Sequence, residues 1–233
     1  MVGDIHPSGP ISPLMPLTSR ASPECALYLV TPPLAAADAG AFARVFVETL
    51  EAASAACALL RLKPDSLAKA EAVAAPFLRA ANDADCALLI ENDVGLAARL
   101  GADGVHVAGA GADLSQAIAR LKPQRIVGAG ALPTRDEAMI AGEMGADYVM
   151  FGELDGAKRA MDLKPLIERV AWWAEIFETP CVACAGTLAE ARALKEAGAD
   201  FVALGEPIFG SSSPAAAARE AQALIAGVSA VAP

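Results

Sequence analysis

The chain has 233 residues, 55% of them hydrophobic, which is enough to bury the core of one large domain or of two small ones. Its net charge of −10 and aromatic content of 5% disfavour nucleic acids and anionic membranes as partners. The sequence contains no uninterrupted run of about 18 apolar residues, so it does not predict a membrane span. Five cysteines, an odd number, fit a reducing compartment better than a disulfide framework.

The amino-terminal segment MVGDIHPSGPISPLMPLTSRASPE is rich in Pro, Ser and Gly. It lacks the basic start and the apolar run of a secretory signal. We therefore expect residues 1–24 to form a flexible arm, residues 25–233 to form a single domain, and the protein to be cytoplasmic.

Beyond residue 25, short apolar segments alternate with alanine-rich amphipathic segments. The apolar segments predict strands at 26–31, 57–62, 86–92, 104–109, 125–130, 148–153, 181–186 and 201–206. The amphipathic segments predict helices at 38–54, 66–82, 94–100, 113–121, 134–144, 162–177, 187–197 and 213–226.

Strands that alternate with helices in one series indicate right-handed parallel crossovers. Eight such units in a chain of 233 residues predict an α/β fold, a (β/α)₈ TIM barrel. An open doubly wound sheet is the alternative. It usually has fewer strands, and the sequence contains no complete dinucleotide-binding fingerprint.

One motif occurs three times, as GADGVHVAG at 101–109, GADYVMFGE at 145–153 and GADFVALGE at 198–206. Each copy precedes or contains a predicted strand. We expect the Gly to end the preceding helix with a positive φ, the Ala to pack beneath the barrel, and the Asp to bond to local backbone in the turn. Helix-to-strand corners lie on the stability face of such a barrel, so the motif predicts scaffold rather than chemistry.

Two cations follow the second predicted strand. Arg61 and Lys63 are two residues apart, a spacing that places both on one face of a strand. A planar guanidinium and a mobile ammonium together suit a polyphosphate. The alternative is a salt bridge at the rim, with Glu91 as partner.

Polar residues also end the third predicted strand, at Glu91-Asn92-Asp93. A carboxylate beside a carboxamide at a strand end can hold Mg²⁺, which prefers oxygen ligands. The alternative is that Asn92 or Asp93 caps the helix that starts near Val94.

Other polar residues favour structural roles. His106 stands alone in a strand and is interpreted as a packed, hydrogen-bonded core residue. Cys181 and Cys184 are three apart in a strand, so they face opposite sides and are interpreted as core cysteines. Glu153 and Glu206 occupy matching places in two copies of the repeat and either line the mouth or are solvated.

A candidate phosphate site lies near the carboxyl end. Gly205 and Ser211 precede the last predicted helix, and Gly186 follows the seventh strand. Backbone N–H groups at a helix start favour anions, and barrels often bind phosphate near strands seven and eight. The alternative is a serine N-cap with Pro214 in the first turn.

Taken together, these segments resemble the thiamine-phosphate synthase family, from LYLVT at 27–31 to the last helix. The most specific stretch is IENDVGLAARLGADGVHVAG at 90–109, supported by LRLK at 60–63 and VACAGTLAEARALKEAGADFVAL at 182–204. The resemblance implies a (β/α)₈ barrel that uses Mg²⁺ to join a pyrimidine pyrophosphate to a thiazole phosphate, releasing pyrophosphate.

The resemblance also implies roles for individual residues. Pyrophosphate would leave first, and the thiazole nitrogen would attack the resulting pyrimidine carbocation. The residues implied are Arg61, Lys63 and Asn92 for the pyrophosphate, Asp93 for Mg²⁺, and Gly186 with Gly205 at the end of the eighth strand for the thiazole phosphate.

The chain departs from the family pattern at several positions. Leu59 stands in place of a glutamine, Gly111 in place of a second metal-binding aspartate, and Gly130 in place of a serine. The segment 152–162 lacks the family's two threonines, and Lys158 matches its lysine only loosely.

Two alternatives therefore remain open. One is a non-catalytic homologue that binds a phosphorylated ligand or a partner. The other is a barrel lyase or isomerase on another phosphorylated substrate, with Glu153 or Glu206 as base. The expected partners are small phosphorylated heterocyclic substrates, with neither nucleic acid nor membrane, and the sequence leaves open whether the chain forms a homo-oligomer.

Overall fold

The computed structural model describes residues 25–154 and 162–227. The predicted arm at 1–24 lies outside the described residues, as do 228–233 and most of the segment 152–162 with Lys158.

Within the described residues, eight parallel strands form a closed barrel in the order of the sequence. The ring closes where β8 pairs with β1, with Ala26 opposite Phe201 and Leu29 opposite Leu204. This closure confirms the predicted (β/α)₈ barrel and rules out the open sheet. The strands are β1 (Ala26–Val30), β2 (Ala55–Leu60), β3 (Ala87–Glu91), β4 (Gly104–Ala108), β5 (Ile126–Gly130), β6 (Tyr148–Phe151), β7 (Cys181–Cys184) and β8 (Phe201–Leu204).

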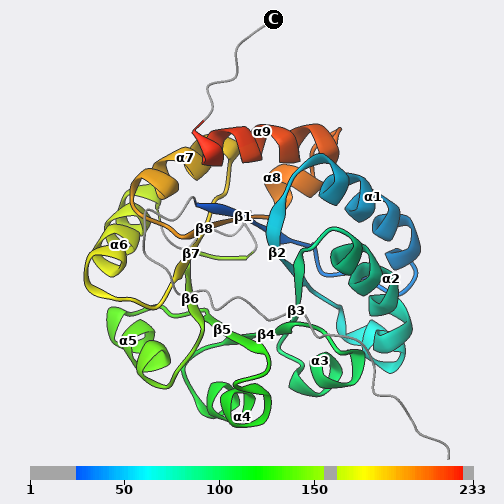
Figure 1. The fold of residues 1–233 in the computed structure, drawn as a ribbon, viewed down its shortest axis with the longest axis horizontal. Coiled ribbons are helices and arrows are strands. Elements are labelled where there is room, and N and C mark those ends of the chain that lie inside the picture. Colours follow the sequence, from blue (N-terminus) through cyan, green and yellow to red (C-terminus); the bar gives the residue numbers. More distant parts are fainter. Residues whose placement is uncertain (1–24, 155–161, 228–233) are drawn as a thin grey trace, which may run out of the picture.

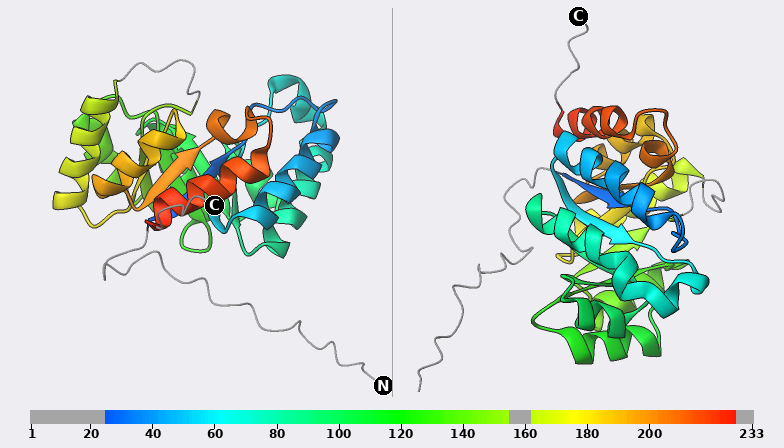
Figure 2. Two further views of the ribbon diagram at one scale, coloured as in Figure 1. Left: turned by 90° about the horizontal axis from the view of Figure 1, so that it is seen from above. Right: turned by 90° about the vertical axis from the view of Figure 1, so that its right-hand side faces the viewer.

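Helices surround the strands as an outer ring (Figure 1) and form a belt at the height of the barrel (Figure 2). No helix in the described part of the chain is long and apolar enough to cross a membrane. The helices are α1 (Ala39–Ala52), η1 (Pro64–Lys69), α2 (Ala70–Asp83), α3 (Val94–Leu100), α4 (Ala112–Leu121), α5 (Arg135–Glu143), α6 (Leu163–Ile176), α7 (Leu188–Glu196), α8 (Glu206–Phe209) and α9 (Pro214–Ala226).

Several expected elements differ from the structure. The strands predicted at 148–153 and 181–186 stop at Phe151 and Cys184, and the helix predicted at 66–82 is η1 followed by α2. The strand predicted at 57–62 is Ala55–Leu60, and Leu62 makes only an isolated parallel bridge to Leu34. The strand predicted at 201–206 stops at Leu204, because Gly205 caps the short helix α8, which has Pro207 in its first turn. Apolar alternation could not reveal a helix of four residues.

The core has two layers, as a barrel requires. One layer fills the space between the strands and the helices and includes Cys181. The other fills the barrel interior and includes Cys184. All five cysteines are buried and free, so the interpretation of Cys181 and Cys184 as core residues on opposite faces is confirmed.

The glycines and alanines of the repeated motif behave as predicted. The alanines Ala102, Ala146 and Ala199 are buried. The glycines end their helices in the left-handed region, where a residue without Cβ is favoured: φ is +73° at Gly101, +96° at Gly145 and +98° at Gly198.

The aspartates of the motif do more than the expected local turn bond. Asp200 accepts a hydrogen bond at Oδ2 from the backbone N–H of Cys181 (2.8 Å), and its own N–H donates to the Cys181 carbonyl (3.1 Å). The expectation of a local bond was wrong, because the aspartate joins the starts of two neighbouring strands. The same pair of bonds joins Asp103 to Leu88 and Asp147 to Val127.

Replacing Asp200 by Ala should lower the free energy of unfolding by about 1–3 kcal/mol, because the buried Cys181 N–H loses its acceptor. Asp200→Asn keeps an acceptor oxygen and should cost less. Urea denaturation of both variants measures this. Equal losses in the two variants would contradict the assigned role of the bond.

Candidate functional site

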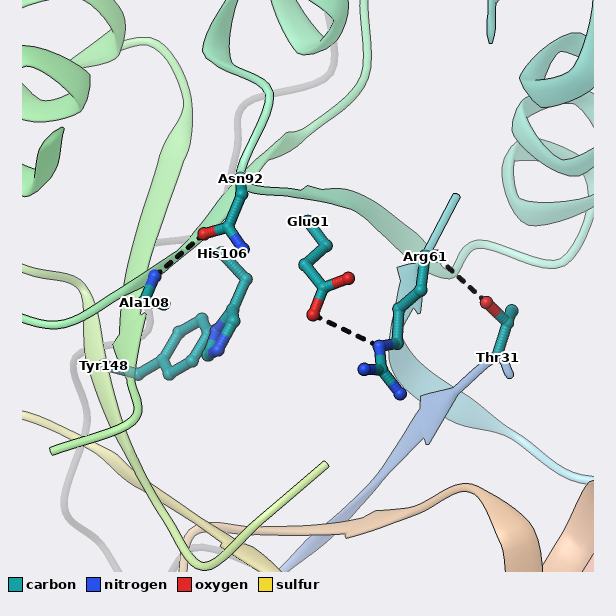
Figure 3. Close-up of polar contacts among 7 residues, drawn as sticks. All are labelled: Thr31, Arg61, Glu91, Asn92, His106, Ala108 and Tyr148. Carbon is teal, nitrogen blue, oxygen red and sulfur yellow. Dashed lines mark hydrogen bonds and ion pairs between the residues drawn. The ribbon is translucent and has the colours of Figure 1, made fainter. Parts of the chain in front are cut away.

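The polar residues singled out in the sequence follow the carboxyl ends of β2, β3, β7 and β8. Because the strands are parallel and closed into a ring, these ends share one face of the barrel. Figure 3 shows part of this face, where side chains from β2, β3 and β4 converge. We call it the mouth.

Arg61 lies just beyond β2 and is 8% exposed. Its Nε donates to Glu91 Oε1 at 3.1 Å, an ion pair between side chains that are 10% and 20% exposed. The backbone N–H of Arg61 donates to Thr31 Oγ1 at 3.0 Å. The alternative predicted for Arg61, a rim salt bridge with Glu91, is therefore present, and it places the guanidinium firmly at the mouth (Figure 3).

Lys63 differs from Arg61 in its surroundings. Its side chain is exposed, whereas its backbone N–H donates to the Leu34 carbonyl at 2.9 Å. The expectation that the two cations share one face relied on a continuous strand, yet β2 ends at Leu60. A shared anion at Arg61 and Lys63 remains a prediction.

Asn92 has a left-handed backbone with φ of +54°, which asparagine tolerates better than most residues. Its Oδ1 accepts from the Ala108 N–H at 2.9 Å, and its own N–H donates to the His106 carbonyl at 2.8 Å. These bonds join the end of β3 to β4 and orient the amide. The amide nitrogen is then the end of the side chain that faces away from Ala108 (Figure 3).

Asp93 is the N-cap of α3, and its Oδ1 accepts from the Leu96 N–H at 2.7 Å. The predicted alternative of helix capping is thus confirmed for Asp93 and not for Asn92. Among the described residues, no group of three or more His, Cys, Asp or Glu side chains could together hold a metal ion. Mg²⁺ is commonly bound by one or two carboxylates plus substrate phosphates, so a single aspartate is compatible with it.

Gly186 follows β7, and its backbone N–H donates to Glu190 Oε2 at 2.8 Å. Glu190 lies in the first turn of α7, whose N-cap Thr187 accepts from the Glu190 N–H. A carboxylate thus occupies the donor that was predicted for a phosphate.

Gly205 and Ser211 flank α8 rather than forming one turn before α9. Ser211 Oγ donates to the Ile208 carbonyl at 2.8 Å, which uses the hydroxyl proton. Ser213 occupies the N-cap position of α9 without a side-chain cap bond, and Pro214 stands in the first turn. The helix start with Pro214 is confirmed, and the serine side-chain cap is not formed.

A buried hydrogen-bonded chain lies in the barrel interior. His106 Nδ1 contacts Tyr148 Oη at 2.8 Å, and Tyr148 Oη contacts Tyr28 Oη at 2.9 Å. The rings of His106 and Tyr148 are stacked with centroids 5.8 Å apart (Figure 3). The interpretation of His106 as a packed core residue is confirmed, since it is 2% exposed.

Burial, and secondarily the positive charge of Arg61, lower the pKa of His106 to about 4. His106 is therefore neutral at pH 7. Burial raises the pKa of Tyr28 and of Tyr148, so both phenols stay protonated. The interior thus contributes hydrogen-bonding groups without net charge.

Sequence reasoning missed Tyr28, Thr31 and Tyr148. In parallel strands buried on both faces, hydrophobicity does not reveal which residues face the interior. The signal that could have revealed the two tyrosines was the two-residue period of a strand. Tyr28 stands two residues before Val30, and Tyr148 two residues before Met150, so each tyrosine shares the interior face with that residue.

An apolar cavity of about 60 Å³ lies away from the mouth. Residues at or near the strand starts line it, including Ala56, Ala87 and Phe201, together with the interior tyrosines Tyr28 and Tyr148. It therefore belongs to the amino-terminal end of the barrel and not to the candidate site.

A (β/α)₈ barrel with cationic, amide and carboxylate groups at the carboxyl ends of its strands has the design of a barrel enzyme. The family model described as thiamine monophosphate synthase matches residues 27–208. The chain belongs to the thiamine-phosphate synthase family, and the resemblance inferred from its motifs is confirmed.

Relatives and solved structures agree. Thiamine-phosphate synthase from Rhodospirillum centenum is 38% identical over 211 residues, covering 88% of this chain and 99% of the relative. The enzyme of that name from Hyphomonas neptunium is 38% identical over 214 residues, covering 89% and 96%. The structure of thiamine phosphate pyrophosphorylase from Pyrococcus furiosus superposes with a TM-score of 0.73 at 22% identity, covering 87% and 96%, and supports the fold.

The lowered pKa of His106 predicts a loss of stability in acid. The unfolded state binds a proton near pH 6.5, whereas the folded state binds it only near pH 4. Stability should therefore be unaffected by this group above pH 6.5 and fall by roughly 3 kcal/mol as the pH drops to about 4. Urea denaturation between pH 4 and 7 measures the fall.

His106→Gln is the matched variant, because it cannot take up the proton. Its unfolding free energy should depend less on pH over this range than that of the wild type. The same pH dependence in both proteins would refute the assignment.

Proposed function

We propose that this chain is a transferase of thiamine biosynthesis that joins a pyrimidine pyrophosphate to a thiazole phosphate and releases pyrophosphate. The proposal is supported by family membership over 27–208 and, above all, by Arg61, Asn92 and Asp93 at adjacent strand ends on one face. The proposed substrates are small phosphorylated heterocycles, and the proposed compartment is the cytoplasm.

The pyrophosphate would bind at Arg61 and Asn92. Figure 3 shows the guanidinium of Arg61 at the mouth, with Nε joined to Glu91. The Asn92 oxygen is held by Ala108, which leaves the NH₂ group as the donor toward an anion. Lys63, on a long exposed side chain, would add a mobile charge at the rim.

Asp93 would hold Mg²⁺ through its carboxylate. Its Oδ1 is committed to the helix cap, so Oδ2 is the oxygen available to a ligand. When bound, Mg²⁺ would neutralise charge on the leaving pyrophosphate. The residues present fit a metal site of this open kind, which is completed by substrate oxygens.

The thiazole phosphate would bind at Gly186, which follows β7. Gly205 and Ser211, which come after the neighbouring strand β8, would complete this phosphate site. It must compete with the Glu190 carboxylate, because a phosphate oxygen and Glu190 Oε2 would need the same N–H. Ser211 can still accept a hydrogen bond, yet its proton is directed to Ile208.

The neutral interior suits the proposed ionisation. Surroundings that add no positive charge avoid destabilising a pyrimidine carbocation. The pKa of about 4 keeps His106 uncharged at pH 7, and its hydrogen bond to Tyr148 fixes the ring in place. Fixed dipoles of this kind need no reorganisation during the reaction.

A coupled pyrophosphate-release assay with pyrimidine pyrophosphate, thiazole phosphate and Mg²⁺ tests the proposal. Arg61→Ala should lower kcat/KM by about 10²–10³-fold, since it removes charge-assisted donors from the leaving group. Asp93→Asn keeps an oxygen for the cap and loses the charge, so it should abolish stimulation by Mg²⁺ while leaving thermal stability nearly unchanged.

Arg192→Ala is the matched control, because Arg192 forms an exposed ion pair with Glu196 within the outer helix α7. It should retain wild-type turnover. If the wild type binds phosphate but does not release pyrophosphate, the chain is a non-catalytic homologue. If turnover requires Glu153 or Glu206 and not Arg61, it is a different barrel enzyme.

A further inference from the structure

Two glycines of β5 leave room for a pair of stacked rings in the barrel interior. A Cβ on Gly128 would overlap the ring of Tyr148, and a Cβ on Gly130 would overlap Nε2 of His106. The two rings lie nearly parallel, at an interplanar angle of 16° (Figure 3). Because Gly130 is the last residue of β5, Nε2 of His106 lies at the end of the barrel that opens into the mouth.

His106 has one ring nitrogen with a partner and one without. Nδ1 contacts Tyr148 Oη at 2.8 Å, whereas Nε2 makes no hydrogen bond within residues 25–154 and 162–227. The residue is 2% exposed. A buried polar atom that lacks a partner is costly, so the position of Nε2 beside the mouth indicates that a ligand supplies one.

The hydrogen-bonded chain to Tyr28 determines which ring nitrogen carries the proton. In one arrangement, Tyr28 donates to Tyr148, Tyr148 donates to Nδ1 of His106, and the histidine proton is on Nε2. This arrangement leaves a single group of the chain, the Nε2–H, without a partner among the described residues. Any other arrangement leaves a phenol proton unpaired as well as Nε2.

The surroundings of Tyr28 disfavour the reverse direction. If Tyr148 donated to Tyr28, the Tyr28 O–H would need an acceptor of its own. Tyr28 borders the apolar cavity, and the nearby Cys57 thiol is only a weak acceptor. A hydroxyl without an acceptor in apolar surroundings is destabilised. His106 therefore presents an uncharged N–H donor to the mouth.

We propose that His106 is a specificity-determining residue that donates a hydrogen bond from Nε2 to a ring nitrogen of the substrate's heterocycle. The proposal rests on the proposed function, in which that heterocycle is a pyrimidine. A pyrimidine is flat and uncharged, and its two ring nitrogens accept hydrogen bonds. The interior beside His106 is apolar, with Leu59, Leu89 and Met150 among its residues, so it accommodates such a ring at lower cost than a phosphate.

Nuclear magnetic resonance tests the protonation of the ring directly. The chain has two histidines, so the full chain labelled with ¹⁵N-histidine gives the signals of two imidazoles, and His6→Gln identifies those of His106. At pH 7 the Nε2 of His106 should carry the proton and Nδ1 should not. A proton on Nδ1 overturns the inference.

Calorimetric titration tests the contact with the heterocycle. The probes are pyrimidinylmethyl phosphate and benzyl phosphate, in which carbon replaces both ring nitrogens. The wild type should bind the pyrimidine probe at least about tenfold more tightly, because the benzyl ring leaves the buried N–H unpaired. His106→Phe keeps an aromatic ring against Tyr148 without the donor, so it should lose this preference. An undiminished preference in His106→Phe overturns the inference.

Glycine variants provide a second test, in which the histidine is kept. Gly130→Ala should displace the imidazole and reduce the preference for the pyrimidine probe, and this variant decides if His106→Phe does not fold. Gly40→Ala is the matched control, because Gly40 lies in the outer helix α1 and a Cβ there meets no atom within 4 Å. It should keep the wild-type preference. The same preference in Gly130→Ala as in Gly40→Ala contradicts the proposal.

Failure of the inference can be told apart from failure of the proposed function. If the wild type binds both probes equally well, the mouth binds phosphate esters and only the role of His106 is wrong. If it binds neither probe, the proposed function is wrong and the inference is overturned with it. Inorganic pyrophosphate is the control for the anion. If it moves the Nε2 signal as far as the pyrimidine probe does, the donor serves the phosphate and the inference is wrong.

Discussion

Closure of the strands into a ring is the constraint on which the site depends. Only when β8 pairs with β1 do the carboxyl ends of all the strands surround one opening. The aspartates of the repeated motif secure the opposite end of the ring, because each one ties the start of its strand to the start of the strand before it. The Gly-Ala-Asp motif takes no part in the proposed reaction, yet it fixes the strands that carry the site residues at their other ends.

The mouth is built from groups that already have partners. Arg61 is paired with Glu91, Asn92 with Ala108, and the Gly186 N–H with Glu190. Such a site is ordered before a ligand arrives, which reduces the entropy lost on binding. It also means that a bound anion must compete with the Glu91 and Glu190 carboxylates for the same donors. The contacts that orient these donors therefore also limit the affinity for the anion.

Much of the fold could be predicted from the sequence, because parallel barrels repeat one unit and the Gly-Ala-Asp corners mark where each unit ends. The strand ends were less predictable. Arg61 and Lys63 looked equivalent by spacing, but β2 stops before both of them, and one is buried while the other is exposed. Boundaries of this kind depend on tertiary pairing, which a single sequence does not display.

The partners within the site were harder still to predict. Glu91 was foreseen as a partner of Arg61 because both end neighbouring strands, and Asp93 as a cap because it precedes a helix. The chain from His106 through Tyr148 to Tyr28 joins residues 42 and 120 positions apart, and no local pattern indicates such contacts. The Glu190 bond to Gly186 was missed because Thr187 and Glu190 look like an ordinary helix start.

The central claim is that adjacent strand ends form one anion-binding mouth. A crystal structure of the chain with Mg²⁺ and pyrophosphate tests it most directly. The account predicts one pyrophosphate within hydrogen-bonding distance of the Arg61 terminal nitrogens and the Asn92 amide nitrogen, with Asp93 on the metal. Pyrophosphate bound elsewhere, with the Arg61–Glu91 pair and Asp93 untouched, would contradict it.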